Sequence, residues 1–245
     1  MDVAPRGRAA IRAYPCVMPK SRVPLSAYPP SPPARASARA SSATALPLAR
    51  KEASRPAGSA THEVRIIGGQ WRRTRIAVAD LPGLRPTPDR VRETLFNWLG
   101  QSLTGWRCLD AFAGTGVLGF EAASRGAAQV LLVEQHAALV SQLQALQKRL
   151  AATTVTVQRG DGLTAVRHAA PGSLQLLLLD PPFDAPPALL DAMLAAAAPA
   201  LAGDGWCYLE APRQWGDAEL VPLGLRLHRH LKAGAVHAHL LVRLV

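Results

Sequence analysis

The chain has 245 residues, a length that suggests one or two domains, and its 28 lysines and arginines against 17 aspartates and glutamates give a formal net charge of +11. No apolar run reaches the roughly 18 residues of a membrane span, since even the leucine-rich Leu174–Leu179 ends at Asp180, so an integral membrane protein is excluded. The three cysteines are odd in number and far apart, which favours a reducing, cytoplasmic compartment over a disulfide framework or a zinc site.

Residues 1–60 differ in composition from the rest of the chain. They hold 10 of the 28 basic residues, 2 of the 17 acidic ones and 10 of the 21 prolines, with no helix or strand period. Such a segment cannot bury enough apolar surface to order itself, so we expect a disordered basic extension. It fits a basic arm for nucleic acid, a targeting segment, or a start codon assigned too far upstream. We favour the last, because organised sequence begins abruptly near Val64.

The segment 61–105 begins with two short β-prone runs, Val64–Ile67 and Arg75–Val78, on either side of a glycine-containing turn. This pattern predicts a hairpin with a basic, exposed turn. A cluster of arginines extends from it into the next element, and we expect it to contact RNA phosphates. Its members are Arg65, Arg72, Arg73, Arg75, Arg85, Arg90 and Arg92.

An amphipathic helix follows the hairpin. Thr87 is the expected N-cap and Pro88 the first helical residue, and the apolar positions continue at helical spacing through Val91, Leu95, Trp98 and Leu99. We expect the polar face to offer Arg90 and Arg92 to a partner.

From residue 106 to 245 the sequence alternates strands and helices. Near-continuously apolar strands in this arrangement predict a parallel sheet covered on both faces, and two final runs, Leu225–Leu231 and Ala235–Leu244, predict an antiparallel hairpin at one edge. The other expected strands are Arg107–Phe112, Val130–Glu134, Val155–Arg159, Leu174–Leu179 and Trp206–Glu210, and the helices are Val117–Arg125, Ala137–Leu150, Leu163–His168 and Ala188–Leu201.

A glycine-rich loop, Gly114–Gly119, joins the first of these strands to its helix, and Glu134 ends the next strand. Glycines let the backbone approach a ligand, and a carboxylate at that strand end can bind both ribose hydroxyls. The pattern fits a dinucleotide or S-adenosylmethionine. Asp110 favours the latter, because a carboxylate repels a pyrophosphate but attracts an ammonium group. Asp161, after the third strand, is placed to accept a hydrogen bond from an adenine amino group.

The tetrapeptide Asp180-Pro181-Pro182-Phe183 follows a buried strand, at the edge where open α/β sheets bind their ligands. The Asp180 carboxylate and the Pro181 carbonyl can both accept hydrogen bonds from a planar NH₂ group, and Phe183 offers a face to a base. Two such acceptors favour the pyramidal form of an exocyclic amine and so help its attack on a sulfonium methyl.

Four histidines, His228, His230, His237 and His239, alternate along the terminal hairpin. They lack cysteine or carboxylate partners in the local pattern, so we interpret them as surface or edge histidines and predict no metal site.

From Val64 to Val245 the chain resembles the RsmD family, the bacterial 16S ribosomal RNA guanine-N2 methyltransferases. The resemblance is most specific at four segments, of which the helix segment discriminates best, since adenine and protein methyltransferases share the last two but not this one. The segments are Arg65-Ile66-Ile67-Gly68-Gly69, the run from Arg85-Pro86-Thr87 through Asp89 to Asn97, Asp110 to Gly126, and Asp180 to Phe183.

The resemblance implies a Rossmann-like class I methyltransferase with a seven-stranded, mostly parallel sheet. It implies transfer of a methyl group from S-adenosylmethionine to guanine 966, in the family's rRNA numbering, within an assembled small subunit. We also expect a monomeric, cytoplasmic enzyme in which residues 61–105 bind RNA and close over the cofactor.

Roles carried over by position follow from the same resemblance. The cofactor would be held by Asp110, Phe112, Gly114, Thr115 and Gly116 at its methionine end, Glu134 at the ribose, Asp161 and Gly162 at the adenine, and Thr87 in the closing turn. The target guanine would be held by Asp180, Pro181, Pro182 and Phe183.

Three other functions stay open. An adenine-N6 methyltransferase acting on RNA or DNA would use the same tetrapeptide. A nucleotide-dependent oxidoreductase would use the glycine loop but would not explain Asp110 or the tetrapeptide. A ribosome-assembly factor would need no catalysis at all.

Overall fold

The computed structural model describes residues 63–244 except 82, 83 and 85. The predictions for residues 1–60 and for Arg85 lie outside these described residues. No helix within the described part is long and apolar enough to cross a membrane.

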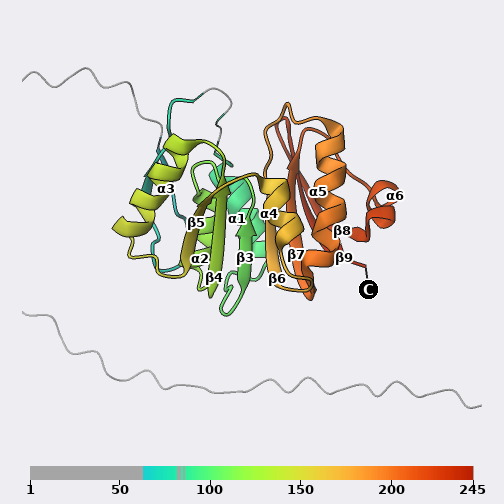
Figure 1. Cartoon of the computed structure of the whole chain (residues 1–245), viewed down its shortest axis with the longest axis horizontal. Helices are drawn as coiled ribbons and strands as arrows, with labels where there is room; N and C mark the ends of the chain where they lie inside the picture. Colours follow the sequence, from blue (N-terminus) through green and yellow to red (C-terminus); the bar gives the residue numbers. More distant parts are fainter. Residues whose placement is uncertain (1–62, 82–83, 85, 245) are drawn as a thin grey trace, which may run out of the picture. The chain divides into compact units, whose positions relative to one another are not determined.

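Seven strands form one sheet in the order β5-β4-β3-β6-β7-β9-β8 (Figure 1). The first five in chain order are parallel, and β9 pairs antiparallel with both β7 and β8. The mostly parallel sheet with an antiparallel C-terminal hairpin is confirmed. The strands are β3 (Arg107–Asp110), β4 (Gln129–Glu134), β5 (Val155–Arg159), β6 (Leu174–Leu179), β7 (Leu201–Ala211), β8 (Leu225–Ala233) and β9 (Val236–Arg243).

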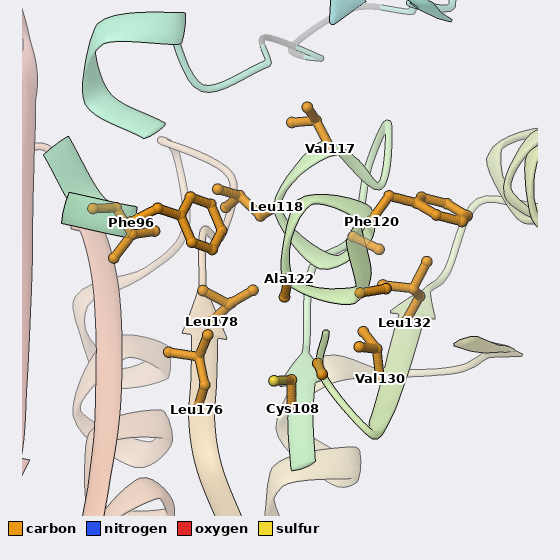
Figure 2. Packing of buried hydrophobic residues seen from close by; sticks show 14 of the residues in the cluster. Phe96, Cys108, Val117, Leu118, Phe120, Ala122, Val130, Leu132, Leu176 and Leu178 are labelled. Atoms are coloured by element: carbon orange, nitrogen blue, oxygen red, sulfur yellow. The ribbon is translucent and has the colours of Figure 1, made fainter. Parts of the chain in front are cut away.

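Helices pack on both faces of this sheet, as near-continuously apolar strands require. Side chains alternate along β6, so Leu176 and Leu178 pack beneath α1 and α2 (Figure 2) while Leu177 and Leu179 join a second core with α5. The helices are α1 (Asp89–Trp98), α2 (Val117–Ser124), α3 (Ala137–Arg149), α4 (Gly162–His168), α5 (Pro187–Ala200), α6 (Asp217–Leu220) and the 3-10 turn η1 (Val221–Leu223).

The predicted N-terminal hairpin forms a separate two-stranded antiparallel sheet, β1 (Glu63–Arg65) and β2 (Arg75–Ala77). Its turn lies against the end of α2, where the Gln70 N–H donates to the Ser124 carbonyl at 2.8 Å. Gly69 has a φ of +72°, and a Cβ there would lie 1.9 Å from the same carbonyl oxygen. Only glycine therefore allows the turn to approach α2 so closely.

The prediction of Thr87 as N-cap is wrong by one residue. The cap is Pro88, whose carbonyl accepts the Val91 and Arg92 N–H groups, and the helix begins at Asp89. Thr87 is unavailable as a cap because its hydroxyl bonds to side chains from β7 and the end of β6.

Candidate active site

Three carboxylates meet at the carboxyl edge of the central strands. Asp110 ends β3, Asp180 follows β6, and Glu210 is the next-to-last residue of β7. Each lies two residues beyond a member of the core beneath α1 and α2, namely Cys108, Leu178 or Tyr208. Because strand side chains alternate, all three carboxylates emerge on that same face of the sheet.

Thr87 joins two of these carboxylates. Its buried hydroxyl donates to Glu210 Oε1 at 2.8 Å and lies 3.4 Å from Asp180 Oδ2, while the Tyr208 hydroxyl donates to Glu210 Oε1 at 2.8 Å. Burial raises the pKa of Asp180, and the charges of Glu210 and Asp110 raise it further. Burial also raises the pKa of Glu210, against the opposing effect of its two hydroxyl donors.

The predicted strand Trp206–Glu210 ends at Glu210, but the sequence pattern did not indicate a role for this residue. A signal was present, because four of the predicted strands carry an acid at or near their carboxyl ends, namely Asp110, Glu134, Asp180 and Glu210. The hydrogen bond between Glu210 and Thr87, which lie 123 positions apart in the sequence, becomes visible only in the folded structure.

The glycine loop is held by two of the predicted carboxylates. Glu134 Oε2 accepts from the Gly114 N–H at 2.9 Å, and Asp110 Oδ2 accepts from the Gly119 N–H at 3.0 Å. Gly114 and Gly116 both have positive φ, which suits glycine. A Cβ on Gly114 would lie 3.2 Å from a Leu84 methyl carbon, so the segment leading to α1 passes over the loop.

The Asp110 carboxylate is buried, and one of its two oxygens, Oδ1, has no hydrogen-bond donor in the described part of the chain. Burial raises the pKa of this carboxyl to about 7. Three carboxylates at one strand edge suit a ligand that brings positive charge and would repel a pyrophosphate, so the residues fit S-adenosylmethionine rather than a dinucleotide.

The remaining predicted cofactor residues surround the same strand ends. Asp161 caps α4, with Oδ2 accepting from Thr164 N–H at 2.7 Å, and its hydrogen bonds hold its pKa below the usual value. A Cβ on Gly162 would lie 2.8 Å from the Phe112 ring, so this glycine lets the ring pack closely. Thr115 is buried and accepts weakly from the Val117 N–H at 3.4 Å, within the loop.

The tetrapeptide and Glu210 share one small pocket. Pro181 is buried, whereas Phe183 is 47% exposed, a large exposed fraction for an apolar residue. The pocket is lined by Pro181, Pro182, Phe183, Ala185, Leu190, Glu210, Ala211 and Pro212.

Five of the seven predicted RNA-binding arginines are exposed. Three of these five are Arg72, Arg73 and Arg90. Arg65 and Arg75 are also exposed and each forms an ion pair at 3.0 Å, with Asp89 and Glu63 respectively.

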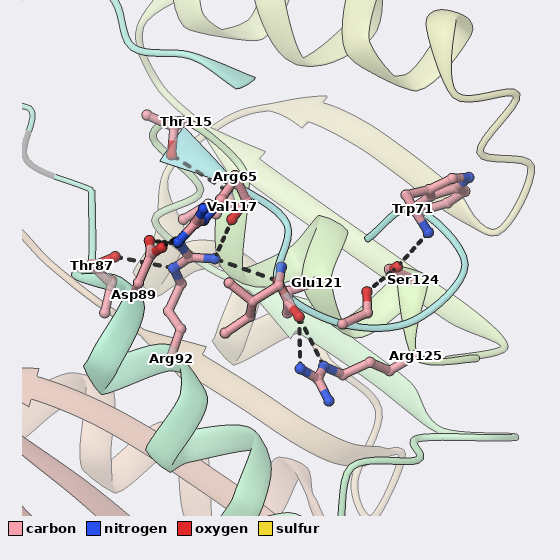
Figure 3. Close-up of polar contacts among 12 residues, drawn as sticks. Arg65, Trp71, Thr87, Asp89, Arg92, Thr115, Val117, Glu121, Ser124 and Arg125 are labelled. Carbon is pink, nitrogen blue, oxygen red and sulfur yellow. Dashed lines mark hydrogen bonds and ion pairs between the residues drawn. The ribbon is translucent and has the colours of Figure 1, made fainter. Parts of the chain in front are cut away.

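The prediction for Arg92 is wrong. Its side chain is fully buried and donates to the carbonyls of Thr87 and Arg65 and to the carboxylates of Asp89 and Glu121 (Figure 3). A side chain so enclosed cannot reach an RNA phosphate. Arg92 instead ties the start of α1 to the N-terminal hairpin and α2.

The terminal histidines have structural partners. His239 is buried, with Nε2 3.0 Å from the Trp215 amide and Nδ1 3.3 Å from the Leu209 carbonyl. The amide can only donate, so Nε2 accepts and Nδ1 carries the proton in a neutral ring. His230 and His237 bond to each other at 3.0 Å. Among residues 63–244 that are described, no group of three or more His, Cys, Asp or Glu is arranged to hold a metal.

Comparison with known proteins gives consistent matches. A family model described as "Conserved hypothetical protein 95" matches residues 64–242. "Ribosomal RNA small subunit methyltransferase D" of Escherichia coli K12 is 38% identical over 188 residues, covering 74% of this chain and 91% of that protein. The relative of the same description in Haemophilus influenzae is 51% identical over 86 residues, covering 35% of this chain and 45% of that protein.

Solved structures also match. One described as "Putative methyltransferase yhhF from Escherichia coli" has a TM-score of 0.65 and 37% identity, covering 75% of this chain and 99% of that one. A Haemophilus influenzae structure has a TM-score of 0.60 and 29% identity, covering 75% and 100%. The sheet and its covering helices are therefore those of a class I methyltransferase.

Proposed function

The chain belongs to the RsmD family, described as "Conserved hypothetical protein 95", and from this membership we propose that it is an S-adenosylmethionine-dependent methyltransferase of small-subunit ribosomal RNA. We further propose that the acceptor is the exocyclic N2 of a guanine in 16S rRNA, position 966 in the family's numbering. The observation that carries the proposal is the Asp180–Phe183 turn, which puts a half-buried carboxylate and an exposed aromatic ring at one strand end.

The target base is unstacked from the RNA and stacks on Phe183, because the reacting amine must reach a site at the sheet edge. The Asp180 carboxylate and the Pro181 carbonyl accept hydrogen bonds from the N2 amine and favour its pyramidal, nucleophilic form. When bound, S-adenosylmethionine supplies the methyl group. The amine proton passes to Asp180, whose raised pKa makes its carboxylate a better base.

The cofactor is proposed to lie over the glycine loop. Asp110 Oδ1 accepts from its ammonium group, which gives that buried oxygen a partner. Glu134 binds the ribose and Asp161 the adenine amine. The segment through Thr87 covers the methionine end, as the position of Leu84 over Gly114 supports.

The exposed arginines Arg65, Arg72, Arg73, Arg75 and Arg90 are proposed to contact rRNA phosphates. The substrate is then the assembled small subunit, and the enzyme acts as a monomer in the cytoplasm.

The decisive test is methyl transfer from labelled S-adenosylmethionine to small subunits that lack the modification, followed by nucleoside analysis of the digested rRNA. We expect the label as N2-methylguanosine. Label as N6-methyladenosine would assign the adenine-N6 alternative instead. If no label is transferred although the protein binds S-adenosylmethionine, the proposed substrate is contradicted. That result would support the alternative of a non-catalytic ribosome-assembly factor.

A further inference from the structure

We infer that Glu210 determines the choice of guanine over other bases, by accepting a hydrogen bond from the N1–H next to the reacting amine. The inference rests on the proposed function and extends it to a residue outside the Asp180–Phe183 turn.

Position is the first argument. Glu210 lies beside Asp180, because Leu179 and Leu209 are paired across the parallel strands β6 and β7. Both carboxylates contact the Thr87 hydroxyl, at 3.4 and 2.8 Å. Glu210 also lines the pocket formed by Pro181, Pro182 and Phe183. A base whose amine is held at Asp180 therefore presents its neighbouring ring atom to Glu210.

The hydrogen bonds of Glu210 fix which of its oxygens is available. Tyr208 and Thr87 both donate to Oε1, each at 2.8 Å. No hydrogen bond to Oε2 occurs within the described part of the chain. These two donors occupy Oε1 and fix the orientation of the carboxyl group, which leaves Oε2 as the acceptor that a ligand can use.

An acceptor at this place separates the bases by their ring nitrogens. The amine of guanine is attached next to N1, which carries a hydrogen and donates to Oε2. The amine of adenine is attached next to an N1 that carries only a lone pair, which a carboxylate repels. An unpaired or repelled group in a buried site is a stronger basis for rejection than a lost apolar contact.

The test uses reconstituted small subunits whose 16S rRNA carries either guanine or 2-aminopurine at the target position. 2-Aminopurine keeps the N2 amine but has an unprotonated N1. We expect the wild-type enzyme to favour guanine in kcat/KM by at least roughly tenfold, the effect of losing one hydrogen bond to a charged group. Equal turnover of the two substrates by the wild type would overturn the inference without any variant.

Glu210→Gln sharpens the test. Tyr208 and Thr87 hold an oxygen at the Oε1 position, so the amide NH₂ faces the pocket and donates to the N1 of 2-aminopurine. The preference for guanine should fall by at least roughly tenfold. An unchanged ratio in a variant that still binds S-adenosylmethionine would overturn the inference, because a merely structural role lowers both rates alike.

Glu219→Gln is the matched control, since Glu219 is an exposed carboxylate on α6 that forms an ion pair with Arg213. This variant should keep the wild-type ratio. Failure of the proposed function looks different: the label would appear on a base other than guanine, or nowhere, in the unsubstituted subunits. N2-methylguanosine formed without discrimination would count against Glu210 alone.

Discussion

Arg92 and Glu121 form an ion pair at 3.4 Å in which both side chains are fully buried. Glu121 Oε2 also accepts from the Ile67 N–H at 2.8 Å, and its Oε1 accepts from Arg125 Nε at 2.9 Å. One carboxylate thus holds α1, α2 and the N-terminal hairpin together. Since α1 begins two residues after Thr87, this network also sets where Thr87 meets Asp180.

Glu121→Ala should destabilise the protein strongly. Glu121 accepts from Arg92, Arg125 and the Ile67 N–H, so its removal leaves Asp89 as the one remaining carboxylate partner of Arg92 among the described residues and leaves buried donors unpaired. The loss of a partner in a buried ion pair should cost about 3–5 kcal/mol in the free energy of unfolding. Glu63→Ala removes one partner of an exposed pair with Arg75 and should cost about 0–1 kcal/mol. Denaturant unfolding of the two variants compares them, and losses of equal size would show that the buried network does not stabilise the fold.

Asp180→Ala should abolish methyl transfer while cofactor binding persists. The variant removes the acceptor that orients the amine and takes its proton, so kcat/KM should fall by at least roughly a hundredfold. Asp184→Ala, an exposed carboxylate on the same turn, is the control and should stay active. Substantial turnover by Asp180→Ala would contradict the assigned role, as would a matching loss in S-adenosylmethionine affinity measured by calorimetry.

The parallel sheet and the glycine loop were predictable because each depends on a local pattern. Apolar runs define the strands, and the positions of Gly114 and Gly116 between a strand and a helix define the loop. Strand ends were less certain: β7 begins at Leu201, five residues before the predicted start at Trp206, because Leu201 pairs with Leu174 across an irregularity in the ladder.

The role of Arg92 could not be predicted in the same way. The spacing of Val91 and Leu95 marks an apolar face, and an arginine beside it normally lies in solvent. Its burial depends on Glu121, which is 29 residues away on another helix. Glu210 was missed for a related reason, since its place in the site depends on Thr87. Polar residues that act through distant partners leave no periodic signal in the sequence.

Replacing Arg72 and Arg73 by alanine should weaken RNA binding and lower its salt dependence. Both are exposed on the hairpin turn, and each phosphate contact contributes about 0.7–0.9 to the slope of log K against log salt, so the slope should fall by about 1.5. Binding to small subunits at several salt concentrations measures it. The paired change of Arg226 and Arg229, exposed on β8, should leave the slope alone, and an unchanged slope in the first variant would remove the hairpin from the interface.

His239→Gln should make the protein less sensitive to acid. Burial lowers the pKa of His239 from 6.5 to about 4, so the unfolded chain binds a proton first as pH falls. The stability that neutral His239 contributes is complete above pH 6.5 and is lost between pH 6.5 and about 4, amounting to about 3 kcal/mol.

Glutamine can accept from the Trp215 amide and donate to the Leu209 carbonyl, but it does not titrate. Denaturant unfolding at pH 7 and pH 4.5 should therefore show a smaller acid loss in this variant than in the wild type. His168→Gln, at an exposed position on α4, should behave as the wild type does. Identical acid losses in all three proteins would mean that His239 is not the group responsible.

Cofactor affinity should depend on pH through Asp110. Burial raises the pKa of its carboxyl to about 7, and only the ionised form attracts an ammonium group. The affinity for S-adenosylmethionine should therefore rise as pH increases through about 7 and level off above it. Asp110→Asn keeps the size of the side chain and its acceptor for the Gly119 N–H but removes the charge.

Calorimetric titration with S-adenosylmethionine between pH 5.5 and 8.5 tests this expectation. In the wild type the affinity should fall by up to tenfold for each pH unit below about 7. Asp110→Asn should bind at least roughly tenfold more weakly at high pH, the effect of losing a charge-assisted hydrogen bond, and should lose this pH dependence. Asp204→Asn, at an exposed position on β7, is the control. A pH profile shared by Asp110→Asn and the wild type would place the titrating group elsewhere and leave the buried Oδ1 without its proposed partner.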